Sequence, residues 1–273
     1  MDKLNFLTAG IPTIAKDYSD AFSKLREIKL DGLEIEFVHG VRMSEKTQDI
    51  VLKNKQDLIL TSHGPYYINL NSKEEEKKDA SVVRILDTAR MANKLGAYSI
   101  VYHAGFYMGD SKEKTFKTIL EGHNKIVEIL EKENNNIWIR PETTGKATQW
   151  GDIDEIIELC KNFKNVLPCV DFAHIHARTN GLFNTYDEFC HIFEKIAKGL
   201  GDKALKNFHA HMAGIAYSQK GEKHHLIFEE SDFNYKDLLK AFKTFDVKGV
   251  IICESPNIEV DCKILKDYWQ SIN

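Results

Sequence analysis

Six short segments of the chain, most of them apolar, each end on a histidine, an aspartate or a glutamate. These residue types bind metal ions in proteins. A buried parallel strand is a short apolar run, and its carboxyl end emerges at the rim of the sheet. If the segments are neighbouring parallel strands, their last side chains converge on one mouth. The segments are Leu58–His63, Ser99–His103, Ile137–Glu142, Val166–Asp171, Leu205–His209 and Val250–Glu254.

Three further candidate ligands lie close to these ends in the sequence. His174 follows Asp171 by three residues, and Glu222 and His224 lie between the last two segments. A zinc ion uses three or four protein ligands, and a carboxylate can bridge two ions. The candidates are therefore too many for one ion and about enough for three. They are His63, His103, Glu142, Asp171, His174, His209, Glu222, His224 and Glu254.

Each candidate alone has an ordinary structural explanation, such as a hydrogen-bonded rim histidine or an aspartate that caps a helix. Their conjunction at six successive strand ends favours metal binding, because several partly buried carboxylates without counter-ions are costly. His176 and His211 each lie two residues beyond a candidate ligand, and we expect them either to orient a ligand or to be structural. Four further histidines do not fit the pattern of ligands at strand ends, namely His39, His123, His191 and His225.

Strand-like and helix-like patterns alternate along the chain. The amphipathic stretches have the 3.6-residue period of helices. They include Tyr18–Ile28, Ala80–Leu95, Thr118–Glu131 and Tyr186–Leu200. The expected strands are rich in Ile, Val and Leu. They are Leu4–Ala9, Gly32–Val38, Leu58–Ser62, Ser99–Tyr102, Ile137–Ile139, Val166–Val170, Leu205–Phe208 and Val250–Cys253.

Helix-start signals agree with this division. Thr185 with Glu188 fits a capping box, and the plausible N-caps are Asp17, Ser44, Ser111 and Asn234. Eight strand–helix pairs in a chain of this length predict an α/β fold, a (β/α)8 TIM barrel that spans residues 1–273 as a single domain. A doubly wound open sheet is the alternative, but no GxGxxG phosphate loop follows the first strand.

Composition limits the class of protein. The chain has 273 residues, of which 42% are hydrophobic and 29% charged, and no apolar stretch is long enough to span a membrane. The N-terminal sequence lacks the pattern of a signal peptide, so we expect a cytoplasmic protein. The five cysteines have no CxxC spacing and are expected to be free thiols. A net charge of −4 argues against a generic basic nucleic-acid binder, although the charge of a metal cluster can attract phosphate.

Seven motifs resemble the endonuclease IV group of apurinic/apyrimidinic endonucleases, which lies within the xylose isomerase-like barrels. The resemblance extends from about Leu4 to Ile272, and the spacing of His209, Glu222, His224 and Glu254 follows the family pattern without a gap. The motifs are SHGPYYINL (62–70), YHAG (102–105), RPETTG (140–145), VDFAH (170–174), FHAH (208–211), EKHH (222–225) and CESP (253–256).

The resemblance implies a zinc-dependent endonuclease that cleaves DNA on the 5′ side of abasic sites in base excision repair, and we expect it to act as a monomer. It implies three zinc ions, held respectively by His63, His103 and Glu142, by Glu142 as a bridge with Asp171, His209 and Glu254, and by His174, Glu222 and His224. Glu142 and Glu254 would be the catalytic residues, with Glu254 orienting or deprotonating the attacking water. Tyr66 falls where the family places a tyrosine that contacts DNA.

Three positions depart from the family pattern. Glu222 stands where the family usually has aspartate, so its longer side chain leaves manganese or iron possible at that site. Pro141 replaces an aliphatic strand residue, and the segment Glu36–Met43 does not clearly reproduce the family loop that enters the abasic gap.

Two other functions compete. A sugar isomerase or epimerase of the xylose isomerase-like group would use one or two divalent ions, for which Glu142, Asp171, His209 and Glu254 would suffice. That function leaves the remaining candidate ligands unexplained. A nucleic-acid-binding protein without catalysis needs no such cluster, and the negative net charge is against it.

Overall fold

Eight parallel strands form a ring in the computed structural model, which describes residues 1–272. Along the sheet the order is β6-β4-β3-β2-β1-β12-β9-β8, and the parallel bridges Ile139↔Val166 and Glu142↔Cys169 join its two ends. The strands are β1 (Leu4–Ala9), β2 (Gly32–Glu36), β3 (Ile59–His63), β4 (Ser99–Tyr102), β6 (Trp138–Pro141), β8 (Val170–Asp171), β9 (Phe208–Met212) and β12 (Gly249–Cys253). The predicted (β/α)8 barrel is confirmed.

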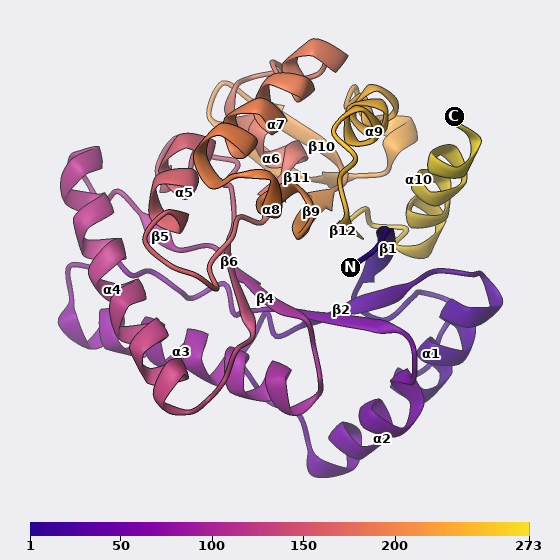
Figure 1. Ribbon diagram of the computed structural model, residues 1–273, viewed down its shortest axis with the longest axis horizontal. Helices are drawn as coiled ribbons and strands as arrows, with labels where there is room; N and C mark the ends of the chain where they lie inside the picture. The colour runs from indigo at the N-terminus through magenta and orange to yellow at the C-terminus, as the bar shows by residue number, and fades with distance from the viewer. Residues whose placement is uncertain (273) are drawn as a thin grey trace.

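Helices cover the outside of this ring (Figure 1). All but the last of them lie in the connections between successive parallel strands, and the last follows the final strand β12. They are α1 (Tyr18–Glu27), α2 (Glu45–Lys55), α3 (Glu75–Lys94), α4 (Lys112–Lys132), α5 (Ile153–Cys160), α6 (Phe172–Arg178), α7 (Tyr186–Leu200), α8 (Asp202–Leu205), α9 (Tyr235–Thr244) and α10 (Glu259–Ser271). None of the helices in residues 1–272 is both long and apolar enough to cross a membrane.

Local sequence signals set where the helices begin. The side chains of all five predicted N-caps, Asp17, Ser44, Ser111, Thr185 and Asn234, accept a hydrogen bond from a backbone N–H in the first turn of their helices. The predicted capping box at the start of α7 is also present. The core between helices and sheet is apolar, with an aromatic cluster where α7 and α9 cover β9.

The seventh strand lies further along the chain than predicted. We expected Leu205–Phe208, but Leu205 ends the short helix α8 and the strand β9 is Phe208–Met212. Phe208 packs against Phe193 and Phe242 on the helix side, whereas His209 and His211 alternate with it and face the interior of the ring. Because these inward-facing residues are polar, a search for an apolar run ends the strand too early.

Two small antiparallel sheets complete the carboxyl end of the barrel. The strands β10 (Gly214–Ser218) and β11 (Gly221–Leu226) form a hairpin that follows β9 directly. The two-residue strands β5 (Gly105–Phe106) and β7 (Gln149–Trp150), from the loops after β4 and β6, pair with each other. Both small sheets lie among the loops where chemistry occurs in barrels of this kind.

Candidate metal centre

Histidine and carboxylate side chains from successive strand ends meet at the carboxyl end of the barrel. His63 and Asp171 are the last residues of β3 and β8, and His103, Glu142 and Glu254 each lie one residue beyond β4, β6 and β12. The parallel register around the ring places these ends at one level, so their side chains converge. The structure thus brings together five of the nine candidate ligands from the strand ends themselves.

The first group consists of His63, His103 and Glu142, whose ligand atoms lie within 4.8 Å of one another. Glu142 Oε2 is 3.1 Å from His63 Nε2 and 2.9 Å from His103 Nε2. Glu142 is buried, and His103 is the most exposed of the three.

The central group consists of Glu142, Asp171, His211 and Glu254. His211 Nδ1 lies 3.3 Å from Glu142 Oε1 and 3.3 Å from Glu254 Oε1. The two carboxylate oxygens of Asp171 differ in their contacts. Oδ1 accepts a hydrogen bond from the His174 backbone N–H at the start of α6, whereas Oδ2 has no hydrogen-bond partner in the described chain. An aspartate that caps a helix can therefore still offer an oxygen to an ion.

The third group consists of Asp171, His174 and His225. His174 Nε2 also lies 3.6 Å from Glu222 Oε2. Gly145, in the loop after β6, makes room for this carboxylate, because a Cβ at that position would stand 2.5 Å from Glu222 Oε2. Glu222 therefore lies at the edge of the third group.

The second nitrogen of three of these histidines is held by a backbone carbonyl. The Nδ1–H of His63, of His174 and of His225 donates to the carbonyl oxygen of Gly64 (2.7 Å), of Thr143 (3.0 Å) and of Glu254 (3.2 Å), respectively. In the neutral imidazole this leaves a lone pair on Nε2. For His63 and His174 that lone pair faces a carboxylate oxygen at 3.1 and 3.6 Å. Two acceptors at such a distance repel each other unless a proton or a cation lies between them.

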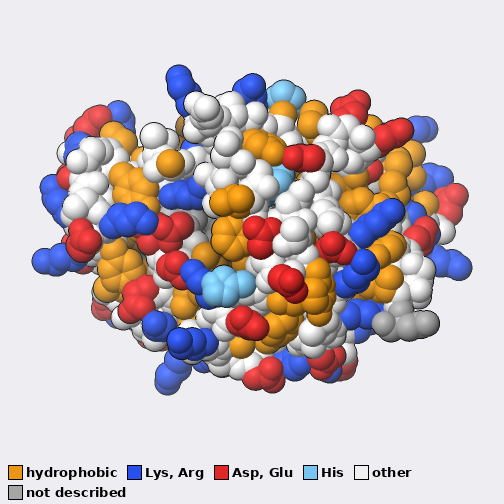
Figure 2. Space-filling view, turned by 90° about the horizontal axis from the view of Figure 1, so that it is seen from above, with side chains coloured by type: hydrophobic (Ala, Val, Ile, Leu, Met, Phe, Trp, Pro, Cys, Tyr) orange, Lys and Arg blue, Asp and Glu red, His pale blue; other side chains and the backbone are white. Residues whose placement is uncertain are grey.

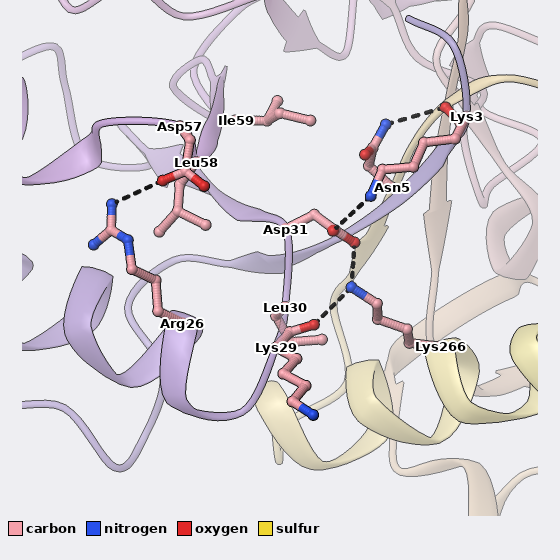
Figure 3. Close-up of a pocket in the computed structure, with 10 residues that line it drawn as sticks. All are labelled: Lys3, Asn5, Arg26, Lys29, Leu30, Asp31, Asp57, Leu58, Ile59 and Lys266. Carbon is pink, nitrogen blue, oxygen red and sulfur yellow. Dashed lines mark hydrogen bonds and ion pairs between the residues drawn. The ribbon is translucent and has the colours of Figure 1, made fainter.

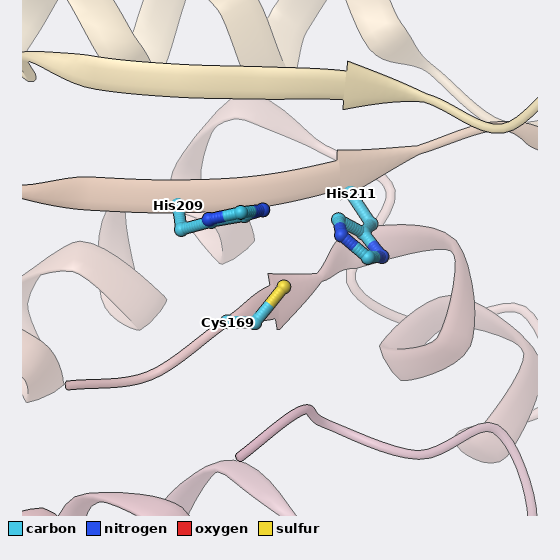
Figure 4. A group of neighbouring side chains, drawn as sticks. All are labelled: Cys169, His209 and His211. Carbon is cyan, nitrogen blue, oxygen red and sulfur yellow. The ribbon is translucent and has the colours of Figure 1, made fainter. Parts of the chain in front are cut away.

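His209 lies outside these three groups and belongs to a fourth, with Cys169 and His211. The residue predicted from the spacing lies one layer deeper, where its Nε2 is 3.4 Å from Glu34 Oε2 and its Nδ1 is 3.1 Å from Ser99 Oγ. His211, two residues further along β9 on the same face, pairs in register with Asp171 of β8 and takes the place at the mouth. Figure 4 shows the two rings one after the other along the same strand, both on the side that faces Cys169.

The structure does not place His224 in these groups either. It is exposed, and its neighbour His225 turns inward toward His174 instead, with the ring centroids 5.8 Å apart. The pairing of β10 with β11 shifts between Ala216 and Tyr217, which leaves Lys223 unpaired as a β-bulge. A bulge adds a residue to one strand and reverses the alternation beyond it, so the side chains of Glu222 and His225 share a face.

The close charges and the burial of the cluster shift the pKa values of its side chains. Burial opposes ionisation, yet His103 and His211 hold the pKa of the Glu142 carboxyl well below its usual range. Burial, Glu254 and Glu142 raise the pKa of Asp171 to about 7. Despite its burial, His63 has its pKa raised to about 10 by the adjacent Glu142. In the metal-free protein, protons therefore take up part of the negative charge that the carboxylates bring together.

The donor set fits metal ions. The nitrogen–oxygen separations of 2.9 to 3.6 Å in the three groups match the distances between neighbouring ligands around an ion whose bonds are about 2.0–2.2 Å long. Asp171 Oδ2 and His211 Nδ1 are buried without a hydrogen-bond partner in the described residues. A mixture of imidazole and carboxylate ligands suits zinc, manganese or iron.

Two glutamates on β2, the buried Glu34 and the partly buried Glu36, were not among the predicted site residues. Glu34 faces the interior of the ring beside His209 and His211, and Glu36 lies two residues further on, at the level of His63. Burial raises the pKa of Glu36 to about 8. The alternating pattern Gly-Leu-Glu-Ile-Glu could have indicated them, because polar residues at every second position of a strand that is covered on both faces must point into the barrel.

Tyr66 lies at the rim of the mouth. Its side chain is exposed, like that of Tyr67, and its ring centroid is 6.1 Å from that of His63. Tyr66 also lines a cavity of about 340 Å³ together with Lys77 and Arg84. A molecule bound at the first group would therefore touch this ring.

Another cavity, of about 370 Å³, opens at the amino ends of β1, β2 and β3 (Figure 3). Lys266 there is 2.7 Å from Asp31, and Arg26 donates to the carbonyl oxygens of Asn54 and Lys55. These cations are satisfied by the chain itself, and the amino end of a barrel contributes to stability rather than to chemistry. We assign this cavity no role in the site.

Charges of both signs are mixed over the surface. On the face seen in Figure 2, Lys and Arg side chains alternate with Asp and Glu and do not form a continuous basic patch. This agrees with the net charge of −4. Attraction of an anionic substrate would therefore depend on charge in the mouth itself.

Comparison with known proteins gives one extensive relative and several partial ones. An uncharacterized protein of Methanocaldococcus jannaschii is 46% identical over 269 residues, which cover 98% of each chain. A probable endonuclease 4 of Oceanobacillus iheyensis is 29% identical over 63% of this chain and 57% of its own. The probable endonuclease 4 of Bacillus subtilis is 25% identical over 80% of this chain and 70% of its own.

Solved structures of two kinds share the fold. A D-tagatose 3-epimerase-like protein matches with a TM-score of 0.74 at 21% identity over 97% of each chain. Endonuclease IV from Thermus thermophilus matches with the same TM-score at 16% identity, over 99% of this chain and all of its own. A family model described as "Xylose isomerase-like TIM barrel" matches residues 22–271. With its ring of eight parallel strands, the chain belongs to the xylose isomerase-like TIM barrel family.

Proposed function

We propose that this protein is a metal-dependent phosphodiester hydrolase of the endonuclease IV kind, which cleaves DNA beside abasic sites. The observation that carries the proposal is the extent of the cluster: the central group is flanked on one side by His63 and His103 and on the other by His174 and His225. A single ion in the central group would leave the histidines on both sides without a metal to bind. The probable endonuclease 4 relatives support the same substrate.

The proposed ligand set differs from the sequence prediction at two positions. His63, His103 and Glu142 would hold the first ion, and Glu142, Asp171, His211 and Glu254 the second. Asp171, His174 and His225 would hold the third, with Glu222 near His174. We propose zinc for these sites, with manganese or iron as the alternative beside Glu222.

Several cations side by side suit phosphodiester hydrolysis because negative charge develops on the attacking, leaving and non-bridging oxygens together. The chain itself would supply the geometry. Glu254 is only partly buried and lies at the open side of the cluster, from which its carboxylate can orient the attacking water and accept its proton. Tyr66 is placed to contact the nucleic acid beside the first group.

The purified protein, loaded with zinc, should nick a duplex that carries one abasic site and leave the matched intact duplex uncut. Chelation should abolish nicking, and readdition of zinc should restore it. His103→Ala removes a ligand of the first group at the more open side of the site, where the fold should tolerate the change. Fully metallated protein that leaves the abasic duplex uncut would contradict the proposal.

A sugar epimerase is the second candidate. The central group alone offers the carboxylates and the histidine that such an enzyme needs, and the D-tagatose 3-epimerase-like structure has the same fold. Metal analysis separates the two candidates. One ion per chain together with turnover of a ketose would favour the epimerase, whereas three ions and abasic nicking would favour the endonuclease.

A further inference from the structure

Glu34 lies directly beneath the central group of the proposed metal centre, inside the ring of strands. It is buried, and its Oε1 stands 3.1 Å from Nε2 of His211. Neither atom has a hydrogen-bond partner in the described chain. The ion pair between the two is therefore the polar contact that each of them makes there.

The ring of His211 points in the opposite sense to that of His63. His63 presents Nε2 to Glu142, because its Nδ1–H donates to the Gly64 carbonyl. His211 instead presents Nδ1, at 3.3 Å from both Glu142 and Glu254, and its Nε2 faces down into the barrel. No carbonyl within residues 1–272 holds this ring, and Glu34 occupies the place where one would be expected.

Glu34 is itself held in position. The hydroxyl of Thr61, on the neighbouring strand β3, donates to Glu34 Oε2 at 2.7 Å, and His209 Nε2 lies 3.4 Å from the same oxygen. Among the ion pairs of residues 1–272, Glu34 has only His209 and His211 as partners, and no lysine or arginine neutralises it.

We propose that Glu34 is a positioning residue, which accepts the Nε2–H of His211 and so keeps the lone pair of Nδ1 directed at the second ion. A carboxylate behind a ligating histidine fixes the tautomer and the orientation of the ring and makes it a better ligand. The inference rests on the proposed metal centre but not on cleavage of DNA.

The substitutions Glu34→Gln and Glu34→Leu separate the effect of the hydrogen-bond acceptor from the effect of the negative charge. The amide oxygen of Gln can still accept the Nε2–H without the charge, whereas Leu fills a similar volume and accepts nothing. Zinc affinity, measured by competition with a chromogenic chelator, should fall in the order wild type, Gln, Leu, with a loss of about 10- to 100-fold for Leu. Ser99→Ala is the matched control, because Ser99 is buried and its Oγ lies 3.1 Å from Nδ1 of His209 rather than beside His211.

A second readout tests the tautomer directly. Long-range 1H–15N spectra of the zinc-loaded protein, with the His211 signals assigned by comparison with His211→Gln, should show the proton on Nε2. Circular dichroism and thermal unfolding would establish that the variants fold, and the Gln variant keeps the test informative if Leu does not.

The inference is overturned if Glu34→Leu binds zinc as tightly as the wild type, or if the proton of His211 is found on Nδ1. Wild-type protein that binds zinc but leaves abasic DNA intact would contradict the proposed function and leave this inference standing. The two failures are thus distinguishable.

Discussion

Each imidazole has two nitrogens, and at this mouth the backbone around each histidine decides which one faces the carboxylates. The Gly64 carbonyl accepts the Nδ1–H of His63 and leaves its Nε2 facing Glu142. Nδ1 of His174 lies near the Thr143 carbonyl and also 3.2 Å from Asp171 Oδ2. His211 is reached from below by Glu34 and presents Nδ1. To assign the ligands, one must therefore know which nitrogen of each histidine faces the cluster. The register of a strand decides whether a histidine reaches the cluster at all.

The first prediction compares the two inward-facing histidines of β9. His211→Ala removes a nitrogen that lies 3.3 Å from two carboxylates, so the second ion should be lost and nicking should fall by at least about 100-fold. His209→Ala removes a ring that is one layer deeper and should retain the metal content of the wild type while lowering stability. Elemental analysis after dialysis measures the ions per chain. Equal loss of metal in both variants would contradict the assignment of His211.

The second prediction uses the pair of histidines on β11. His225→Ala should remove the third ion and weaken nicking, because His225 lies within the group of Asp171 and His174. His224→Ala is the matched control one residue away: its side chain is exposed, and metal content and activity should stay within twofold of the wild type. If His224→Ala lost metal and His225→Ala did not, the bulge at Lys223 would be absent from the protein in solution.

At the scale of the elements, the alternation of apolar runs and amphipathic stretches predicted the barrel because the strands that make its wall are apolar on both faces. The same rule failed for β9, whose inner face carries His209 and His211. It failed again at β11, because the bulge that turns His225 inward depends on pairing with β10, which the residue types of the segment do not reveal. Strand ends that carry one ligand after an apolar run, such as His63 and Asp171, could be predicted.

The third prediction concerns the packing of α4 against β4. His123 of α4 is buried; its Nδ1–H donates to the Ile119 carbonyl, and its Nε2 accepts from the Tyr102 hydroxyl at 2.7 Å. Burial lowers the pKa of His123 to about 4. The unfolded chain takes up this proton near pH 6.5 and the folded chain does not, so stability is complete above about pH 6.5 and is lost as the pH falls toward 4.

The expected size of this loss is about 3 kcal/mol between pH 7 and pH 4. Urea unfolding of the wild type and of His123→Gln at several pH values measures it, because the difference between the two proteins cancels the other titrating groups. Between pH 7 and pH 4, the free energy of unfolding of the variant should therefore fall by about 3 kcal/mol less than that of the wild type. Parallel curves for the two proteins would mean that His123 titrates normally.

At the scale of the whole molecule, the cluster collects side chains from six strands of the ring, or from the residue directly after them, and from the hairpin after β9. The two ends of the sheet meet where the segment 165–169, just before β8, pairs with residues 139–143 in and after β6 through backbone hydrogen bonds and two parallel bridges. Glu142 and Asp171 stand at the carboxyl ends of these two strands. Ions shared between them would add a further link where the ring closes.

The fourth prediction follows from this placement. Ligands that bind only the folded state stabilise it by mass action, by about 4 kcal/mol at a thousandfold excess over Kd, which raises Tm by roughly 10 °C for a chain of this length. Calorimetry of chelated protein with and without zinc measures the shift. The double variant His63→Ala/His103→Ala, in which only the first group is removed, should keep part of it, because the ion between Glu142 and Asp171 would remain. A Tm that does not respond to zinc would contradict a resident metal centre, since the buried oxygens of Asp171 and Glu142 would then need no cation to stay together.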